Sequence, residues 1–551
     1  MDDKNMKKIL LINAPVSIYV NKTAFVPLSL LVLGTCLKKI KQDGVDISYE
    51  LLDLDFLIKK DLLPDDESFF RKASHLILEK EPDILMFTVH GPNHVLVLKL
   101  AEQIKKQKSC LIIVGGVGPT LTAKDALERC KDIDIIVKGE GETVLEPLVQ
   151  ATVTTGSFAD VPSIVYRENG QIIENKRRFL AADEPIPAPD YSLVQIEDYI
   201  AHNKTHPYIH PGFVLIESGR GCTHGCSFCA PAKMWGRNVR YRPVPEIIAE
   251  MEFLAEKGGN FSFFTQDNLD EHFLRELSAA LIERDSKIAW GCYSRLDRLS
   301  IDMAELLSKA GCKIIFTGLE TPNRSAQKKI HKVIDADSTF AKLKIFNQQG
   351  IRLIGSFIAG FSGETDAELE NTMRFAIECA VGRSLADLER FVSATPADQL
   401  PQKPDNICVI HPLAHMAGTE AFYEEFDNLH ISRYSAHPDC YGSYLFGYEH
   451  FKDDWSLLGI NPYFSQLSER EAAYYCSILR LFNLLNSRPY FFTLLMQARN
   501  LRPLALLKEM VAQLGEEFVL SAKVDKFEQK SLEYIQQYLD FVPKWTVKKG
   551  Q

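Results

Sequence analysis

Three cysteines within eight residues are the strongest chemical signal in the chain. Cys222, Cys226 and Cys229 lie in the stretch SGRGCTHGCSFC, residues 218–229. The beginning of the chain, MDDKNMKKILLINAP, predicts neither a secretory signal nor a transit peptide. In a reducing compartment, such closely spaced cysteines indicate metal or redox chemistry rather than disulfide bonds. We therefore expect the three thiolates to bind a metal centre.

The number of ligands separates the possible metal centres. Structural zinc usually takes four Cys or His ligands, and the fourth here would be His224, whose backbone position between two cysteines makes that geometry awkward. A ferredoxin cluster takes four cysteines, so three would leave one iron without a protein ligand. An open coordination position is where a metal centre performs chemistry. The spacing favours an open iron–sulfur cluster, with zinc as the lesser alternative.

The cysteines follow the first of six strand-like runs that alternate with helical patterns. These runs are FVLIESGRGC, NFSFFTQDN, KIAWGCYSR, CKIIFTGLET, IRLIGSFIAGF and NICVIHPLAH. Six strands are too few for a closed eight-fold barrel but suit a partial barrel that is open at its side. We predict such a barrel over residues 213–425, with the cysteines at the carboxyl end of its first strand, where α/β enzymes place their sites.

The first 150 residues show a second α/β pattern. Apolar strands are predicted at KKILLINAP, VDISYELLDLD, PDILMFTVHG, SCLIIVGGVG and DIDIIVKGEGE, with helices between them. Such runs predict a doubly wound, Rossmann-like parallel sheet over residues 1–150. Residues 151–212 contain a hairpin, SIVYRENGQIIENKR, and a proline-rich stretch, DEPIPAPDYS, and are predicted to form a linker. Residues 426–551 are predicted to form a mostly helical region.

Composition limits the class of protein. The 551 residues predict two or three domains, and 46% hydrophobic with 25% charged residues is typical of a globular protein. The formal net charge of −10 argues against a nucleic-acid surface as the main site. The longest apolar runs are shorter than a membrane span. We expect a cytoplasmic protein.

The cysteine stretch resembles the signature of the radical S-adenosylmethionine superfamily. Phe228 precedes the third cysteine, a strand precedes the stretch and α/β repeats follow it. The resemblance implies that the three cysteines hold a [4Fe-4S] cluster whose open iron binds the amino and carboxylate groups of S-adenosylmethionine. It also implies that one electron, from a reducing partner such as flavodoxin or ferredoxin, cleaves this cofactor to methionine and a deoxyadenosyl radical.

The same resemblance suggests cofactor-binding residues at the ends of the later strands. Gln266 and Asp267 correspond to the group at the amino end of S-adenosylmethionine, Ser294 and Arg295 suit its carboxylate and ribose, and Glu320 ends the fourth strand. IAGFSGET resembles the fifth-strand turn. HPLAHMAGTEAFYEE resembles the sixth, although the family more often has Pro where this chain has His415 or Ala417. The alternative is that these polar groups only cap strand ends or helix starts.

Glycines mark a second cofactor site in the first domain. No G-x-G-x-x-G motif follows the first strand, but VGGVGPTLTA follows the fourth. Gly115 and Gly116 have no side chains, so a bulky group could pass close to the backbone there. Thr120 and Thr122 offer hydroxyl groups. The order of strand, Gly-Gly, Thr and IIVKGEGE, which contains Glu140, resembles the cobalamin-binding domain of cobalamin-dependent radical S-adenosylmethionine enzymes.

The chain departs from one cobalamin pattern. Many such domains have Asp-x-His-x-x-Gly after the first strand, whose His ligates cobalt, whereas this chain has NAPVSIYVNKTAFVPLS without any His. His90 or Asn93, in VHGPNH, is then the candidate for contact with the lower face of the corrin. The alternatives are an ordinary hydrogen-bonding loop, and a domain that does not bind cobalamin at all.

The resemblance implies a methylase that acts on an unactivated carbon of a small-molecule natural-product intermediate or a peptide. One S-adenosylmethionine methylates reduced cobalamin, and a second gives the radical that activates the substrate. Catalytic side chains are not assigned, because the cofactors carry the reactivity. One alternative is a rearrangement, ring contraction or cyclisation with the same cofactors. A second is methylthio transfer, which is disfavoured because Cys36, Cys110 and Cys130 are too far apart in the sequence for a second cysteine triad. A third is a binding module with a structural or sensory cluster.

Two further expectations concern the substrate side. The helical region is expected to close the barrel mouth, with Cys440 and Trp455 of a Tyr-rich loop lining the substrate pocket or serving as ordinary packing. Cys292 and Cys408 are candidate hydrogen donors, or buried inert thiols.

Overall fold

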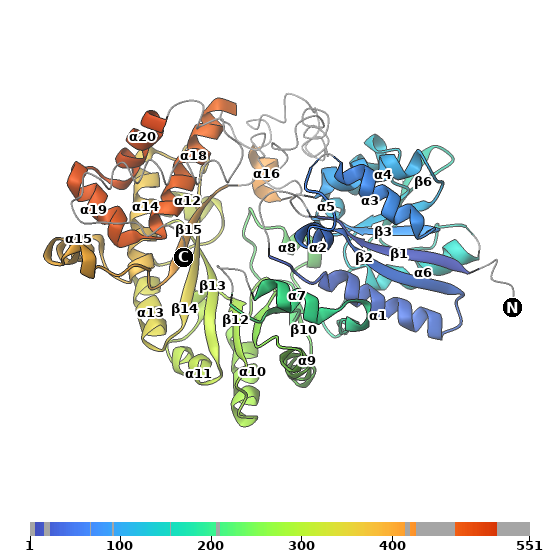
Figure 1. Ribbon diagram of the computed structural model, residues 1–551, viewed down its shortest axis with the longest axis horizontal. Coiled ribbons are helices and arrows are strands. Elements are labelled where there is room, and N and C mark those ends of the chain that lie inside the picture. Colours follow the sequence, from blue (N-terminus) through green and yellow to red (C-terminus); the bar gives the residue numbers. More distant parts are fainter. Residues whose placement is uncertain are drawn as a thin grey trace.

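The computed structural model describes residues 6–15, 23–66, 68–90, 93–154, 156–204, 210–413, 419–425 and 469–514 (Figure 1). Two large sheets lie side by side, each with its own helices. Red C-terminal helices cover the second sheet on the side away from the first. None of the described helices is both long and apolar enough to cross a membrane.

The first sheet has seven strands in the order β2-β1-β3-β4-β5-β6-β7. Five parallel strands come first, which confirms the predicted doubly wound, Rossmann-like domain. Two antiparallel strands follow. The strands are β1 (Lys7–Asn13), β2 (Ile47–Asp53), β3 (Ile84–Thr88), β4 (Leu111–Gly115), β5 (Ile135–Val137), β6 (Ile164–Glu168) and β7 (Gln171–Glu174).

Strand β1 shows why this sheet is covered on both faces. Ile9 and Leu11 are buried against α1 (Leu28–Gln42) and α6 (Glu142–Val153). Leu10 and Ile12 point to the other face and are buried with α3 (Phe69–Glu79), α4 (His94–Lys105) and α5 (Val117–Arg129). Successive side chains of a strand alternate between faces, so a continuous apolar run requires a layer of helices on each side.

The hairpin predicted within the linker is part of the first sheet. Strand β6 pairs with β5, with Ile136 opposite Val165, and β7 pairs with β6. Val165 and Ile164 are fully buried, one on each side of the sheet. The apolar side chains of the hairpin therefore complete the core of the first sheet, and the proline-rich crossing begins after β7.

The second sheet is the predicted partial barrel. Its six parallel strands run in the order β8-β11-β12-β13-β14-β15. Strands β8 and β15 do not pair with each other, so the barrel is open at its side. The strands are β8 (Phe213–Ile216), β11 (Phe261–Phe264), β12 (Ala289–Tyr293), β13 (Cys312–Glu320), β14 (Arg352–Ala359) and β15 (Ile407–Pro412). The helices between them include α9 (Val244–Glu256), α10 (Glu271–Glu283), α11 (Met303–Lys309), α12 (Arg324–Lys329), α13 (Ala336–Gln348), α14 (Asp366–Val381) and α15 (Leu385–Ala394).

Three described helices of the C-terminal region pack beside the barrel, and the first of them lies along the free edge of β15. They are α18 (Glu469–Asn486), α19 (Pro489–Arg499) and α20 (Pro503–Leu514). The Asn483 carboxamide accepts a hydrogen bond from Ile410 N at 2.8 Å and donates one to Ile410 O at 2.9 Å. Asn486 donates to Cys408 O at 2.9 Å. Unpaired strand edges expose hydrogen-bonding groups, and α18 satisfies these groups with side chains.

A buried carboxylate joins the first sheet to α7 (Ile196–Asn203), which precedes the barrel. Asp53, at the end of β2, accepts hydrogen bonds from Asn13 Nδ2 at 2.9 Å, Phe56 N at 2.9 Å and Tyr199 Oη at 2.7 Å. The rings of Phe56 and Tyr199 stack beside it. Burial raises the pKa of Asp53 to about 6, although these hydrogen bonds act in the opposite direction.

The raised pKa predicts a pH-dependent stability. Because its pKa is raised, Asp53 stays protonated up to a higher pH in the folded chain than in the unfolded chain. The contribution of Asp53 to the free energy of unfolding therefore decreases as the pH rises from about 3.9, the ordinary pKa, through about 6, the folded value. Relative to Asp53→Asn, the wild-type Tm should fall by roughly 2–5 °C between about pH 5 and pH 7.5. Differential scanning calorimetry checks this, with the exposed Asp285→Asn as a control. An unchanged Tm difference would contradict the assignment.

Candidate functional site

The three cysteines lie together on one loop at the carboxyl end of the barrel. The loop follows β8 and β9 (Gly219–Arg220) and ends at α8 (Pro231–Trp235). Cys222, Cys226 and Cys229 are partly buried free thiols. Burial raises the pKa of all three, to about 12 for Cys229, where the charges of Cys226, Asp267 and Cys222 add to the effect of burial. Cys229 N donates to Cys226 O at 3.2 Å within this loop, and thiols ionise when a metal binds them.

The donor set fits a cluster better than a single ion. Among the described residues, no three Cys, His, Asp or Glu side chains converge on a point where one metal ion could bind. A [4Fe-4S] cluster does not require such convergence, because each thiolate binds a different iron. Three neighbouring thiols on one partly buried loop fit that cluster and leave its fourth iron free of protein ligands.

Backbone and apolar contacts hold the cysteine loop in place. Ser227 N donates to Ile330 O at 3.2 Å, and Ser227 Oγ donates to Lys329 O at 3.0 Å. From the other side, Ala421 N of α16 (Glu420–Glu425) donates to Ser227 O at 3.0 Å. Phe228 packs against the apolar cluster that contains Ile330. The residues between the second and third cysteines are thus fixed to the segment after α12.

Gln266 and Asp267 contact the cysteine loop from β11. Gln266 is buried, and its Nε2 donates to Gly221 O at 3.4 Å. A Cβ at Gly219 would lie 2.1 Å from Gln266 Oε1, so the glycine makes room for this side chain. Exposed Asp267 accepts a hydrogen bond from Trp235 Nε1 at 3.0 Å. Their described contacts position the loop, and the binding of S-adenosylmethionine by either residue stays a prediction.

Ser294 and Arg295, after β12, are also near the loop. Ser294 Oγ donates to Leu269 O at 2.8 Å, which fixes the strand end. Arg295 forms an ion pair with Asp297 at 2.7 Å. The pKa of Arg295 is raised: burial acts to lower it, but the hydrogen bond and charge of Asp297, followed by the charge of Cys226, outweigh burial. Arg295 is therefore a cation beside the thiols.

Glu320 has a partner that the sequence did not suggest. Its Oε1 accepts a hydrogen bond from Lys332 Nζ at 2.7 Å, and both side chains are about 7% exposed. A Cβ at Gly318 would lie 2.1 Å from Glu320 Oε1 and 2.6 Å from Lys332 Nζ. The glycine thus leaves space for a buried ion pair. Burial raises the pKa of Cys226, and the positive charge of Lys332 acts in the opposite direction. The Glu320–Lys332 pair is therefore part of the electrostatic surroundings of the cysteine loop.

The Gly-Gly turn of the first domain is held tightly. Gly116 has φ +117°, and a Cβ there would lie 2.2 Å from Val89 O, so the neighbouring backbone accounts for this glycine. At Gly115 a Cβ would meet only Val137, at 3.7 Å, which leaves room at this position for another group. Thr120 Oγ1 donates to Gly116 O at 2.6 Å and accepts from Gly139 N at 2.9 Å. Thr122 lies on the same helix, α5.

His90 and Asn93 differ in their surroundings. His90 is exposed at the carboxyl end of β3. Asn93 is fully buried: it accepts from His90 N at 2.7 Å and donates to Ala14 O at 3.2 Å and Thr88 O at 3.4 Å. The carboxamide of Asn93 thus ties the ends of β1 and β3 together, and contact of either residue with a corrin stays a prediction.

Glu140 belongs to a buried ionic network between the two sheets. Its carboxylate accepts from Arg220 at 2.6 Å and also pairs with Arg240 of β10 (Arg240–Tyr241). Arg220 further binds Glu142 at 2.6 Å and Glu217 at 2.8 Å. We call these five residues the interdomain network. Arg220, Arg240 and Glu142 were not predicted as site residues, because each is recognisable only through partners that are distant in sequence.

The carboxyl edge of the first sheet faces the cysteine loop of the barrel (Figure 1). Helix α5, which begins after the Gly-Gly turn, contacts α8, which follows the cysteines. In Figure 1 both helices lie between the sheets, on the side to which the strands of the first sheet point. Ligands of such sheets bind beyond the carboxyl ends of the strands. The room at Gly115 and the exposed His90 lie at that edge.

Five other described cysteines were considered in the sequence analysis, and none of them lies on the cysteine loop. Cys292 and Cys408 are almost fully buried, and burial raises the pKa of both, to about 12 for Cys408, which fits inert thiols. Cys36 packs on one face of the first sheet and Cys110 and Cys130 pack on the other, so these three form no second triad. The expectations for His415, Ala417, Cys440 and Trp455 lie outside the described residues.

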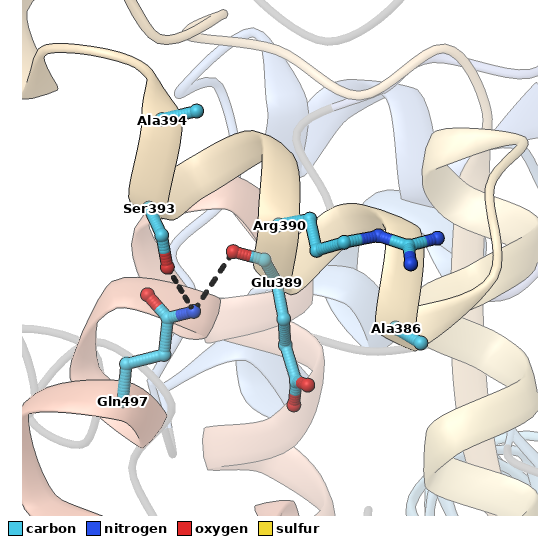
Figure 2. Close-up of a pocket in the computed structure, with 6 residues that line it drawn as sticks. All are labelled: Ala386, Glu389, Arg390, Ser393, Ala394 and Gln497. Carbon is cyan, nitrogen blue, oxygen red and sulfur yellow. Dashed lines mark hydrogen bonds between the residues drawn. The ribbon is translucent and has the colours of Figure 1, made fainter.

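A surface hollow between α15 and α19 is separate from this site. Figure 2 shows Gln497 Nε2 bridging Glu389 O at 2.9 Å and Ser393 Oγ at 3.0 Å. The hollow lies at the far edge of the molecule from α8 (Figure 1). Its polar groups bind one another, and it contributes no group to the cysteine loop.

Comparisons with known proteins agree with these two sites. Residues 216–376 match the Radical SAM superfamily, and residues 36–149 match the B12 binding domain. A Pyrococcus horikoshii protein named as an uncharacterized methyltransferase is 27% identical over 334 residues, 59% of this chain and 70% of that protein. The anaerobic magnesium-protoporphyrin IX monomethyl ester cyclase of a Synechocystis species is 26% identical over 378 residues, 67% of this chain and 72% of the cyclase.

A solved structure supports the fold. OxsB, a cobalamin-dependent S-adenosylmethionine radical enzyme solved with aqua-cobalamin and S-adenosylmethionine bound, aligns with a TM-score of 0.63. The alignment covers 98% of this chain and 82% of OxsB at 16% identity. The chain thus joins a B12 binding domain to a Radical SAM domain, as cobalamin-dependent radical S-adenosylmethionine enzymes do, and its cofactors are a [4Fe-4S] cluster, S-adenosylmethionine and cobalamin.

Proposed function

We propose that the chain is a methyltransferase that adds a methyl group to an unactivated carbon of a small-molecule natural-product intermediate or a peptide. The observation that carries this proposal is the direct contact of the cysteine loop with the cobalamin-binding domain through Arg220, Glu140 and Glu142. Methyl transfer from a corrin to a substrate radical needs the two cofactors to face one space. A contact between the loops that hold them supports such an arrangement.

The chain's own residues hold and surround the cofactors. When bound, the cofactors supply a methyl group and a radical that removes hydrogen from the substrate. Cys222, Cys226 and Cys229 would hold the cluster, and the charges of Arg295 and Lys332, which act on Cys226, would attract the carboxylate of S-adenosylmethionine. Both cations are already paired and largely buried, so they are oriented before the cofactor binds.

The proposal includes a reducing partner such as flavodoxin or ferredoxin, because cleavage of S-adenosylmethionine consumes one electron. The second candidate is a ring contraction, cyclisation or other rearrangement with the same cofactors. Three relatives, at 26–28% identity, are named cyclases, which favours this alternative, whereas a relative at 27% identity is named a methyltransferase. Recovery of the methyl group separates the two candidates.

The cluster and cobalamin sites should be separable by substitution. The triple variant Cys222→Ala, Cys226→Ala, Cys229→Ala should reduce bound iron and sulfide to background after anaerobic reconstitution, because it removes all three thiolate ligands. Cobalamin should stay near one per chain, because its predicted binding residues lie at the edge of the first sheet. Optical spectra with iron and corrin quantitation check this, with Cys36→Ala as a control that keeps both cofactors. Loss of cobalamin from the triple variant would contradict the assignment.

The methyl-transfer proposal predicts the fate of a label. Reconstituted protein, given S-adenosylmethionine with a deuterated methyl group and a chemical reductant, should transfer the label to the corrin fraction before any substrate is added. Mass spectrometry of the extracted corrin measures this transfer, and protein reconstituted without hydroxocobalamin is the blank. If deoxyadenosine forms while the corrin stays unlabelled, methyl transfer is ruled out and the rearrangement is favoured.

A further inference from the structure

We propose that Arg220 is a positioning residue that fixes the separation between the iron–sulfur cluster and cobalamin. It does so by tying the cysteine loop to the B12 binding domain through Glu140 and Glu142. This inference rests on the two cofactors of the family and not on methyl transfer. It concerns a residue outside the cysteine motif that touches neither the cysteine ligands nor the Gly-Gly turn.

On the barrel side, Arg220 is rigidly joined to the first cluster ligand. Only Gly221 separates it from Cys222, and Gly221 has φ +94°, with Asn238 O so close that a Cβ would lie 2.0 Å from it. The Arg220 guanidinium also lies over the ring of Trp235, 5.6 Å from its centroid. Trp235 ends α8, the helix after Cys229. Arg220 therefore contacts elements on both sides of the cysteine motif.

On the cobalamin side, Glu140 is joined to the Gly-Gly turn. Its neighbour Gly139 donates to Thr120 Oγ1 at 2.9 Å, and that hydroxyl donates to Gly116 O at 2.6 Å. Glu142 is the first residue of α6, where a carboxylate is stabilised by the helix dipole. The two carboxylates are thus fixed to the end of β5 and, through Thr120, to the turn that follows β4.

The chemistry of the contact makes it stiff. Arg220 Nη1 binds Glu140 and Nη2 binds Glu142, each at 2.6 Å, while Nε and Nη2 both bind Glu217. A planar guanidinium with several charge-assisted bonds allows little rotation or sliding. The Arg220 and Glu140 side chains are 6% and 9% exposed, so water cannot readily replace these partners. Buried charges that lose a partner are strongly unfavourable, which resists separation of the loops.

A fixed separation matters because the reacting groups of both cofactors must reach one substrate. Reactions between bound groups need the reacting atoms about 3–3.5 Å apart, and a displacement of about 1 Å can cost a factor of about 100 in rate. A flexible interface between the two domains would spread the cofactors over many separations. The interdomain network reduces that spread at the point where the two cofactor loops meet.

The test measures the coupling between the two cofactors themselves. In the holoenzyme reduced to cob(II)alamin and [4Fe-4S]1+, both centres carry an unpaired spin, and their spin–spin coupling, measured by continuous-wave and pulsed EPR, reports their separation. Wild-type protein should give one narrow coupling. The double variant Glu140→Gln, Glu142→Gln should give a weaker and broader distribution, and Glu142→Gln alone an intermediate one, with each spectrum normalised to the iron and cobalamin bound.

Glu250→Gln is the matched control. Glu250 forms an equally buried ion pair with Arg242, but both residues belong to the barrel chain, at and just before α9. Its coupling should equal that of wild type. The proposal is overturned if both network variants keep the narrow coupling, or if Glu250→Gln broadens it as much as they do. The single variant decides the outcome if the double variant does not fold. The labelled-methyl experiment is independent, so either proposal can fail alone.

Discussion

The interdomain network constrains how the first sheet and the barrel are placed relative to each other. It consists of three carboxylates and two guanidinium groups that lie together between the two sheets. Apolar packing also joins the two domains, because the core of the barrel continues into Val26, Leu31 and Phe56 of the first domain. Ionic contacts with fixed geometry supply orientation that non-directional burial does not. Arg220 is the centre of this contact, because it binds carboxylates from both sides of the interface.

Much of the fold could be predicted because parallel strands that are buried on both faces appear in the sequence as continuous apolar runs. Ile9 to Ile12 alternate between two covered faces, so the whole run is apolar, and the same holds for the other central strands of the first sheet. The cysteine motif could also be predicted, since its ligands are local. The sequence predicts both the strand that contains Ile136 and the hairpin that contains Val165, but it does not show that the two pair, because it does not indicate which strand lies at the sheet edge.

The charged partners around the site could not be predicted for a different reason. Glu140 and Arg220 are 80 residues apart, and neither stretch of sequence indicates that the two side chains pair. Lys332 gains its role only from Glu320 and from the space that Gly318 leaves for both. Gln266 and Asn93 were predicted as cofactor contacts, and in the structure their carboxamides form hydrogen bonds to the backbone of neighbouring loops. The sequence does not separate these two roles of a polar side chain.

The hairpin β6–β7 has a consequence for how the first domain can be divided from the rest. Strand β5 has only three residues, and its outer edge is covered by β6. A fragment ending near residue 150, where the family match stops, would bare that edge together with the apolar side chains that Ile164 and Val165 cover. Uncovered strand edges recruit other chains. The structural unit of the first sheet therefore extends through residue 174, the end of β7.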